Sequence, residues 1–174
     1  MDKLLNKIIK SKTLILSVFM AGFLSCKDVK VENSECIIVE VILIMQKNDT
    51  LELFYNSRKN ESFMAKKSLR KPINGSTSEQ KIKFVLEQGI YPTRLRLDLG
   101  ENQNQKEILI KNITLKYNNG NHEFSNLELE KYFKPSKYFN FENLRGKPMV
   151  IDRKYDPYLE SYNISKFINK LILN

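Results

Sequence analysis

The sequence predicts an all-β domain, an antiparallel β-sandwich with a short C-terminal helix, preceded by a signal peptide. From residue 35 onward, apolar residues recur at every second position, which is the period of a strand with one face in a core. Turn-forming residues separate these segments, and helical spacing appears only near the C-terminus. A chain of 174 residues is long enough for one domain with a substantial core but hardly for two. We therefore expect one domain over residues 36–174.

The first strands are expected directly after residue 36. The apolar face of the first one is formed by Ile37, Val39, Val41, Leu43 and Met45. Turn-forming residues at 47–49 come next and the alternation resumes over 51–55, so we expect these two strands to form a hairpin. After a basic loop the pattern returns over 82–86 and again over 95–99, with charged residues at the water-facing positions.

The segment 108–117 contains a change of phase. The apolar residues at 108 and 110 face one side of a regular strand, whereas those at 113, 115 and 117 face the other. One extra residue at Lys111-Asn112, a β-bulge, would restore a common apolar face. The sequence Asn-Asn-Gly-Asn at 118–121 then favours a hairpin turn, because Asn and Gly tolerate positive φ angles. The return strand is expected to begin at His122.

The last third of the chain is less regular. Residues 125–133 are expected to form one or two helical turns that end at Pro135, and two further short strands are expected around Arg145-Gly146. From Ile164 the apolar residues fall at helical intervals behind a capping residue, Asn163. We expect a short terminal helix there.

The N-terminus has the pattern of a targeting segment. A basic opening precedes the apolar run TLILSVFMAGFL, which is too short to span a bilayer as a helix. The sequence Phe-Leu-Ser-Cys at 23–26 resembles the bacterial lipobox in the looser form typical of Bacteroidota, with Phe23 in place of the usual Leu. The resemblance implies cleavage before Cys26 and attachment of a diacylglycerol to its thiol, so residues 1–25 are expected to be a signal peptide. The alternatives are an ordinary signal peptide with an incidental cysteine and an uncleaved anchor.

Acylation of Cys26 would hold the mature protein at a membrane. Buried acyl chains such as palmitate contribute about 0.8 kcal/mol per methylene, and two chains suffice for stable anchoring. Residues 26–35 are mostly polar and are expected to form the lipidated cysteine and a flexible tether. The pair Lys27-Asp28 resembles the start of a tag that directs some Bacteroidota lipoproteins to the cell surface. We expect the lipid anchor to lie in the outer membrane, with the domain facing the periplasm or the exterior.

The second cysteine, Cys36, has no partner for a disulfide once Cys26 is a thioether. It stands at the start of an apolar run, where we expect a small buried thiol. A reactive thiol and an intermolecular bridge are the alternatives.

Four segments occur in a characteristic order along the chain: 50–55, 94–100, 108–117 and the sequence Tyr-Asp-Pro-Tyr at 155–158. Together they resemble a β-sandwich found in uncharacterised Bacteroidota lipoproteins and beside some glycan-handling membrane proteins. The resemblance covers roughly residues 36–160. It implies a jelly-roll-like, carbohydrate-binding-like fold, although fold analogy alone does not give function.

The sequence lacks the motifs of common enzyme and metal sites. His122 is the single histidine, which excludes a multi-histidine metal site, and we expect it to be solvated beside the hairpin turn. No phosphate-binding loop, dinucleotide fingerprint or nucleophile elbow occurs, and the acids are not spaced as in a calcium loop. The pair Asp152 and Asp156 would serve a glycosidase only if folding set the two carboxyls at a suitable separation. We therefore expect no enzyme activity, no cofactor and no metal.

Two groups of residues suit ligand binding. The first offers the ingredients of a sugar site, an aromatic face for a pyranose and planar polar groups for its hydroxyls. Its members are Tyr138, Asn140, Asp152, Arg153, Tyr155, Asp156 and Tyr158. The second is a basic cluster suited to anionic headgroups or glycans. Its members are Lys66, Lys67, Arg70 and Lys71. The plainer alternatives are ordinary strand tyrosines and a solvated loop.

The charge of the chain narrows the classes of partner. The formal net charge is +9, and removal of residues 1–25, which hold four lysines and one aspartate, lowers it to +6. This excess is modest, and export disfavours a specific nucleic-acid partner. Three hypotheses remain: a noncatalytic envelope lipoprotein that binds protein or other envelope components, a carbohydrate-binding accessory domain, and a small envelope hydrolase. We expect the first of these three functions.

Overall fold

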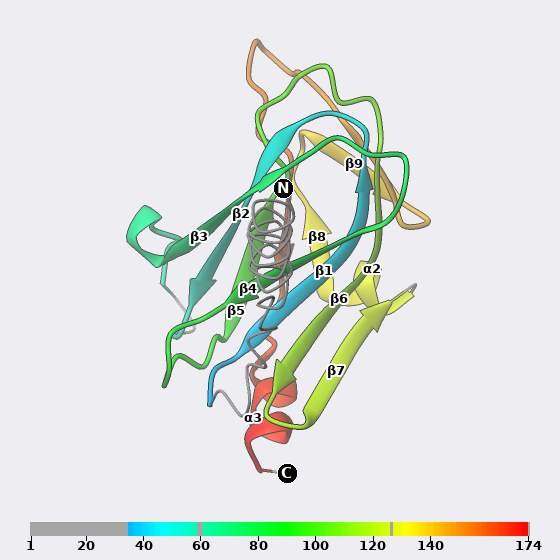
Figure 1. Cartoon of the computed structure of the whole chain (residues 1–174). Helices are drawn as coiled ribbons and strands as arrows, with labels where there is room; N and C mark the ends of the chain where they lie inside the picture. The colour runs from blue at the N-terminus through cyan, green and yellow to red at the C-terminus, as the bar shows by residue number, and fades with distance from the viewer. Residues whose placement is uncertain (1–34, 59–60, 126, 174) are drawn as a thin grey trace, which may run out of the picture. The chain divides into compact units, whose positions relative to one another are not determined.

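The computed structural model describes residues 35–58, 61–125 and 127–173, which form two antiparallel sheets and short helices (Figure 1). The first sheet has the order β4-β1-β6-β10-β9, and β7 also pairs with β6. Its strands are β1 (Ile38–Met45), β4 (Gln80–Val85), β6 (Ile108–Tyr117), β7 (Gly120–Ser125), β9 (Phe139–Glu142) and β10 (Arg145–Pro148). The second sheet has the order β3-β2-β5-β11-β8. Its strands are β2 (Asp49–Asn56), β3 (Ser68–Ile73), β5 (Arg94–Asp98), β8 (Phe133–Pro135) and β11 (Tyr158–Ser161).

Helical structure is confined to three short elements in the described part of the chain. They are η1 (Ala65–Lys67), α2 (Leu127–Tyr132) and α3 (Ser165–Leu173). The predicted all-β antiparallel sandwich with a short C-terminal helix is confirmed. Asn163, predicted as the cap, stands two residues before the start of α3, and its Oδ1 accepts a hydrogen bond of 2.9 Å from the backbone N–H of Ser165, the first residue of that helix.

The core lies between the inner faces of the two sheets. The alternating residues predicted for the first strand, from Ile37 to Met45, are all fully buried, and so are Leu51 and Phe84. Among the described residues, the buried apolar side chains run from Ile37 to Leu171 and form one cluster. The period of two therefore identified the faces that the sheets bury against each other.

The predicted bulge in β6 is confirmed. The register of β1 with β6 shifts between Ile42 and Leu43, which pair with Asn112 and Ile110, so Lys111 is the extra residue. Ile108, Ile110 and Ile113 consequently point into the core together. The hairpin of β6 and β7 is confirmed as well, with Tyr117 opposite Gly120.

The expected hairpin of the first two strands is wrong. β1 pairs with β4 and β6 in the first sheet, whereas β2 pairs with β3 and β5 in the second. The turn at 46–48 carries the chain from one sheet to the other. Alternate residues of the two strands are buried whether the turn joins them in one sheet or links two sheets. The sequence pattern is therefore the same for both arrangements.

The basic cluster is not a loop. Arg70 and Lys71 lie in the strand β3, and Lys66 and Lys67 lie in η1. β3 forms the edge of the second sheet, where charged residues and a proline protect the unpaired backbone. Its alternation is broken at Lys71, which is exposed although it lies opposite the buried Leu51 of β2.

The last third contains more strands than expected. α2 is confirmed, but Pro135 is the last residue of β8. β9 and β10 form a hairpin whose turn is at Asn143-Leu144, both with positive φ, so Arg145-Gly146 belongs to β10 rather than to a connection. β11 was not expected and completes the second sheet.

The predicted signal peptide, Cys26 and nearly all of the tether lie outside the described residues. Cys36 is half-buried rather than buried, and its thiol is free. In the described ranges, no helix is both long enough and apolar enough to cross a membrane.

Candidate functional site

A polar pocket of about 500 Å³ opens at one end of the second sheet, where β2 begins and β5 ends. Its walls come from strands β2, β3 and β5 and from the connections 99–107 and 149–157. Four carboxylates line it, those of Glu52, Asp98, Glu101 and Asp156. Two arginines, an aromatic ring, an amide and a hydroxyl complete the polar lining. They belong to Arg70, Arg153, Tyr155, Gln103 and Thr50.

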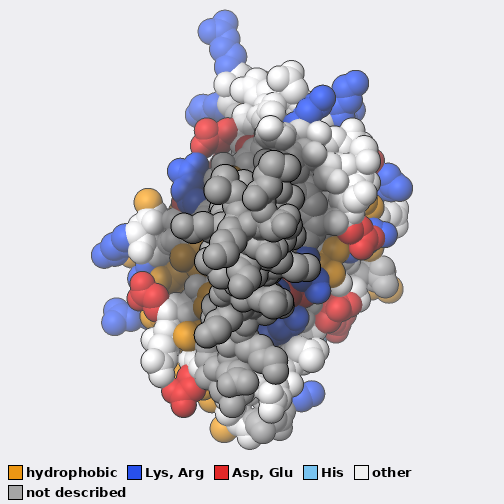
Figure 2. All heavy atoms as spheres, viewed as in Figure 1, with side chains coloured by type: hydrophobic (Ala, Val, Ile, Leu, Met, Phe, Trp, Pro, Cys, Tyr) orange, Lys and Arg blue, Asp and Glu red, His pale blue; other side chains and the backbone are white. Residues whose placement is uncertain are grey.

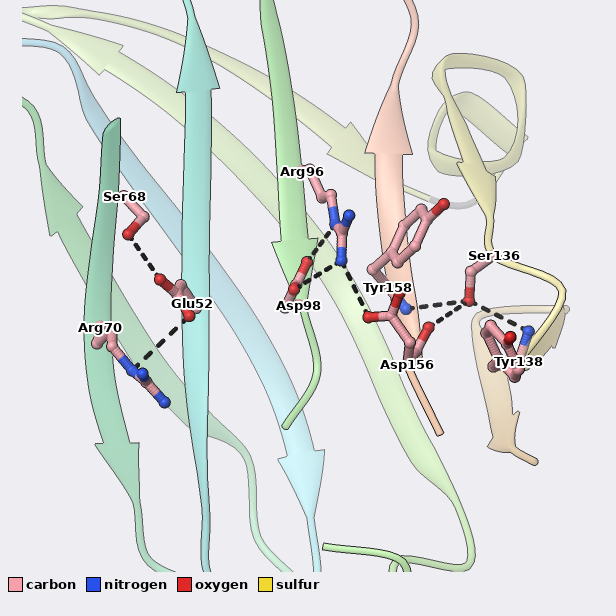
Figure 3. A network of polar contacts seen from close by, with 9 residues as sticks. All are labelled: Glu52, Ser68, Arg70, Arg96, Asp98, Ser136, Tyr138, Asp156 and Tyr158. Atoms are coloured by element: carbon pink, nitrogen blue, oxygen red, sulfur yellow. Dashed lines mark hydrogen bonds and ion pairs between the residues drawn. The ribbon is translucent and has the colours of Figure 1, made fainter. Parts of the chain in front are cut away.

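Arg96 organises two of these carboxylates on the outer face of the second sheet (Figure 3). Its Nε donates to Asp98 Oδ1 at 2.6 Å, and its Nη2 donates to Asp98 Oδ2 at 2.8 Å and to Asp156 Oδ1 at 2.9 Å. The guanidinium carbon also lies 3.8 Å from the centre of the Tyr158 ring, which faces it from β11. The planar fork therefore holds both acids in fixed positions.

Glu52 is held from the other side. Its Oε1 accepts a hydrogen bond of 2.6 Å from the Ser68 hydroxyl, and Arg70 Nε lies 3.7 Å from its Oε2. Glu52 is opposite Arg70 on β3 and opposite Asp98 on β5, so the three side chains form a row across the sheet. Figure 3 shows this row beside the Arg96 network.

Asp98 has an unusual affinity for a proton. Burial of its carboxyl, together with the neighbouring charges of Asp156 and Glu52, raises its pKa to about 6 in spite of the opposing pair with Arg96. The pocket therefore gains negative charge as the pH rises through about 6. Below that pH, Asp98 carries a proton.

Asp49 fixes the wall formed by the connection 99–107. Its carboxylate accepts hydrogen bonds from the backbone N–H groups of Thr50, Glu101 and Asn102, at 2.8, 2.9 and 3.0 Å. Gly100 has a φ of +98°, and a Cβ there would lie 2.1 Å from the Asp49 carboxyl carbon. Only glycine fits this approach without a shift of the wall.

Tyr155 closes the pocket on the side of the connection 149–157. Its hydroxyl donates to the carbonyl oxygen of Asn102 at 3.1 Å, which joins the two connections. Burial and the charge of Asp49 raise the pKa of Tyr155 to about 12, so the hydroxyl keeps its proton.

The structure brings together part of the predicted aromatic and polar group. Arg153, Tyr155 and Asp156 line the pocket, and Tyr158 lies beside it on Arg96. The remaining members do not line it. Tyr138 is bound through its backbone N–H to Ser136, Asn140 lies on β9 in the other sheet, and Asp152 stands in the turn next to Arg153 with a φ of +51°.

Only one member of the basic cluster reaches the pocket. Arg70 lines it, whereas Lys67 Nζ lies 2.6 Å from Glu61 Oε1, and Lys66 and Lys71 are exposed elsewhere. The space-filling view shows lysine and arginine side chains spread along the edges of the molecule, with acidic side chains between them (Figure 2).

Sequence reasoning missed Glu52, Asp98 and Glu101 as pocket residues. Asp98 was expected to face water, which is correct for its face of the sheet. The site is marked in the sequence by charged residues at the outward positions of β2, β3 and β5. These residues become neighbours only because the chain passes between the two sheets and returns to place β5 beside β2.

His122 is not the solvated histidine that was expected. Its ring stacks on Phe167 of α3 at a centroid distance of 4.1 Å and meets Phe124 edge-on at 4.6 Å. Burial lowers its pKa, against the raising effect of Glu128. The ring therefore serves the packing of α3 on β7.

The described residues contain no group of three or more His, Cys, Asp or Glu side chains arranged to hold a metal ion. Comparison of the chain with models of known families, with curated proteins and with solved structures finds no match in any of the three.

Proposed function

We propose that this protein is a lipoprotein of the bacterial envelope, anchored to the outer membrane through acylated Cys26, and that its sandwich domain is a noncatalytic module that binds a saccharide. The pocket between β2, β5 and Tyr155 is the proposed binding site. A protein or another envelope component as the ligand is the alternative.

The polar lining of the pocket is the observation that carries the proposal. Saccharide hydroxyls both donate and accept hydrogen bonds, and the pocket offers carboxylate acceptors next to guanidinium donors. Tyr155 adds an aromatic surface of the kind that packs on a sugar ring. Because most of the charges are already paired within the protein, an uncharged, hydroxyl-rich ligand fits this site better than a strongly charged one.

The occupied carboxyl oxygens favour binding over hydrolysis. A glycosidase needs one carboxyl to give a proton and another to attack or to activate water. Both oxygens of Asp98 and one of Asp156 accept hydrogen bonds from Arg96. Asp152, the other member of the pair considered from the sequence, does not line the pocket.

The anchor is tested by the intact mass of the protein extracted from membranes. We expect a chain that begins at Cys26 and carries the mass of a diacylglycerol. A Cys26→Ser variant should lose this mass and leave the membrane fraction. A variant that is processed and retained as the parent is would contradict the anchor.

The saccharide site is tested with a glycan array and two variants of adjacent residues. Arg153 lines the pocket, whereas Lys154 is exposed in the same turn and does not. We expect Arg153→Ala to lose binding at least about tenfold, which corresponds to the loss of a hydrogen bond to a charged group. Lys154→Ala should bind as the parent does. Absence of binding to any glycan would contradict the saccharide as the ligand.

A further inference from the structure

The end of the sandwich opposite the pocket exposes apolar side chains. Val85 at the end of β4 is 48% exposed, Tyr91 is 38% exposed and Leu173 at the end of α3 is 84% exposed. The ring of Tyr117 meets that of Tyr91 at 6.1 Å, and Tyr117 and Ile172 line a shared hollow of about 390 Å³. We call these five residues the apolar end face. Tyr117 and Ile172 are half-buried, so the face has three exposed apolar side chains beside two partly accessible ones, which is more than the single exposed apolar residues that are ordinary on protein surfaces.

The strand directions place this face and the pocket at opposite ends. β1 runs from the apolar end face toward the pocket, because it is antiparallel to β4 and β6. The connections 46–48, 99–107 and 149–157 are therefore at the pocket end, and 86–93 and 118–119 are at the other. Figure 1 shows α3 and the β6–β7 turn together at one end and the connections 99–107 and 149–157 at the other.

The chain enters the domain next to the apolar end face. The Leu86 backbone N–H donates to the Ile37 carbonyl at 2.9 Å, and Gln88 Nε2 donates to Glu35 Oε2 at 2.7 Å. These contacts hold residue 35 against the connection that carries Tyr91. The pKa of Tyr117 is raised, chiefly by its hydrogen bond with Tyr91 and in part by the nearby charge of Glu35. The face and the entry point of the chain thus form one region.

We propose that the apolar end face lies in the interface of the phospholipid bilayer that holds the acyl chains of Cys26, so that the pocket faces away from the membrane. This inference rests on the proposed acylation. Only residues 27–34 separate Cys26 from Glu35, a reach of at most about 30 Å when fully extended. The short tether keeps this end at a high local concentration beside the lipid, where tyrosines and aliphatic side chains are favoured.

Charged side chains of both signs surround the face. Glu35 and Glu87 are exposed beside it, and so are Lys83, two residues before Val85, and Lys170 on α3. Apolar insertion is the contribution that the face itself adds, so docking should occur on zwitterionic vesicles that contain no anionic lipid.

The test uses the absence of tryptophan from the chain. The full acylated protein is reconstituted on phosphatidylcholine vesicles with brominated acyl chains, as Tyr91→Trp and, separately, as Val150→Trp. Val150 is the matched control, because it is 51% exposed and lies in the connection 149–157 at the pocket end. Leu173→Trp provides a second position on the face, 84% exposed and therefore tolerant of substitution.

We expect Tyr91→Trp and Leu173→Trp to lose fluorescence to the bromine and to emit at shorter wavelength on vesicles, and Val150→Trp to do neither. Flotation of the vesicles separates the two proposals. If the protein floats but neither face position is quenched, the docking is wrong and the anchor stands. If the protein does not float, both are wrong. A blue shift without quenching, together with a dimer on cross-linking, would show that a second copy covers the face and would overturn the docking.

Discussion

Replacement of Asp98 by Asn should change how the stability of the domain depends on pH. The carboxyl has a pKa of about 6 in the folded protein, against an ordinary value of 3.8. The folded state therefore binds this proton more tightly than the unfolded state does. The resulting stabilisation is complete below about pH 4 and is lost as the pH rises through about 6. The difference between the two pKa values corresponds to about 3 kcal/mol, and the side chain is only 22% exposed, so little of it is screened.

The assay is urea unfolding of a chain that begins at Lys27, for the parent and for Asp98→Asn, at a series of pH values from about 3 to about 8. Asn also loses one acceptor for Arg96, which shifts the whole curve without tilting it. The informative quantity is therefore the difference between the two curves. It should favour the parent at low pH and decline by about 3 kcal/mol toward neutral pH.

Two results would refute this reasoning. Parallel curves would mean that the proton affinity of Asp98 is ordinary. A difference that grows in favour of the parent as the pH rises would mean that the pair with Arg96 outweighs burial and lowers the pKa.

Three further substitutions test other contacts by the same unfolding assay. His122→Phe keeps the stack on α3 but cannot titrate; since burial lowers the pKa of His122, the parent should lose stability relative to this variant as the pH falls below about 6.5, and equal pH profiles would count against the burial. Gly146→Ala should destabilise by about 1–3 kcal/mol, because its Cβ would lie 1.7 Å from the Phe139 ring; an unchanged urea midpoint would disprove the close contact. Asn163→Ala should cost about 1 kcal/mol through the loss of the cap on Ser165, and an unchanged stability would show that the cap is dispensable.

The fold was predictable for strands that have one face buried in the core and the other exposed to solvent. β5 shows this most clearly, with Leu95 and Leu97 inside and Arg94, Arg96 and Asp98 outside. The bulge at Lys111 was predictable for the same reason, since only an extra residue reconciles the two apolar phases. The placement of β1 and β2 in different sheets was not predictable, because a turn of the same length joins strands within one sheet or across two.

The candidate site was predictable only along a single stretch of chain. Arg153, Tyr155 and Asp156 are near neighbours in sequence, so any fold keeps them close. Glu52 and Asp98 join them because β5 lies between β2 and β11, strands that are far apart in the sequence. No local pattern encodes that order.

Whether a connection lies at the pocket end or at the apolar end face depends on the number of strands that precede it. The ends were therefore not predictable from the sequence. In an antiparallel sandwich each added strand reverses the direction of the chain, so alternate connections fall at alternate ends. The sequence predicts a basic loop around Lys66 to Lys71, and without β3 the strand at 80–85 would be counted as running from the chain's entry point toward the far end. That count would put Tyr91 at the same end as the connection 46–48 and far from Glu35. With β3 included, the count places Tyr91 at the same end as Glu35. The structure shows this arrangement, because Gln88, in the connection that carries Tyr91, donates a hydrogen bond to Glu35. The separation of pocket and membrane-facing end therefore depends on recognising one edge strand whose charges conceal its period.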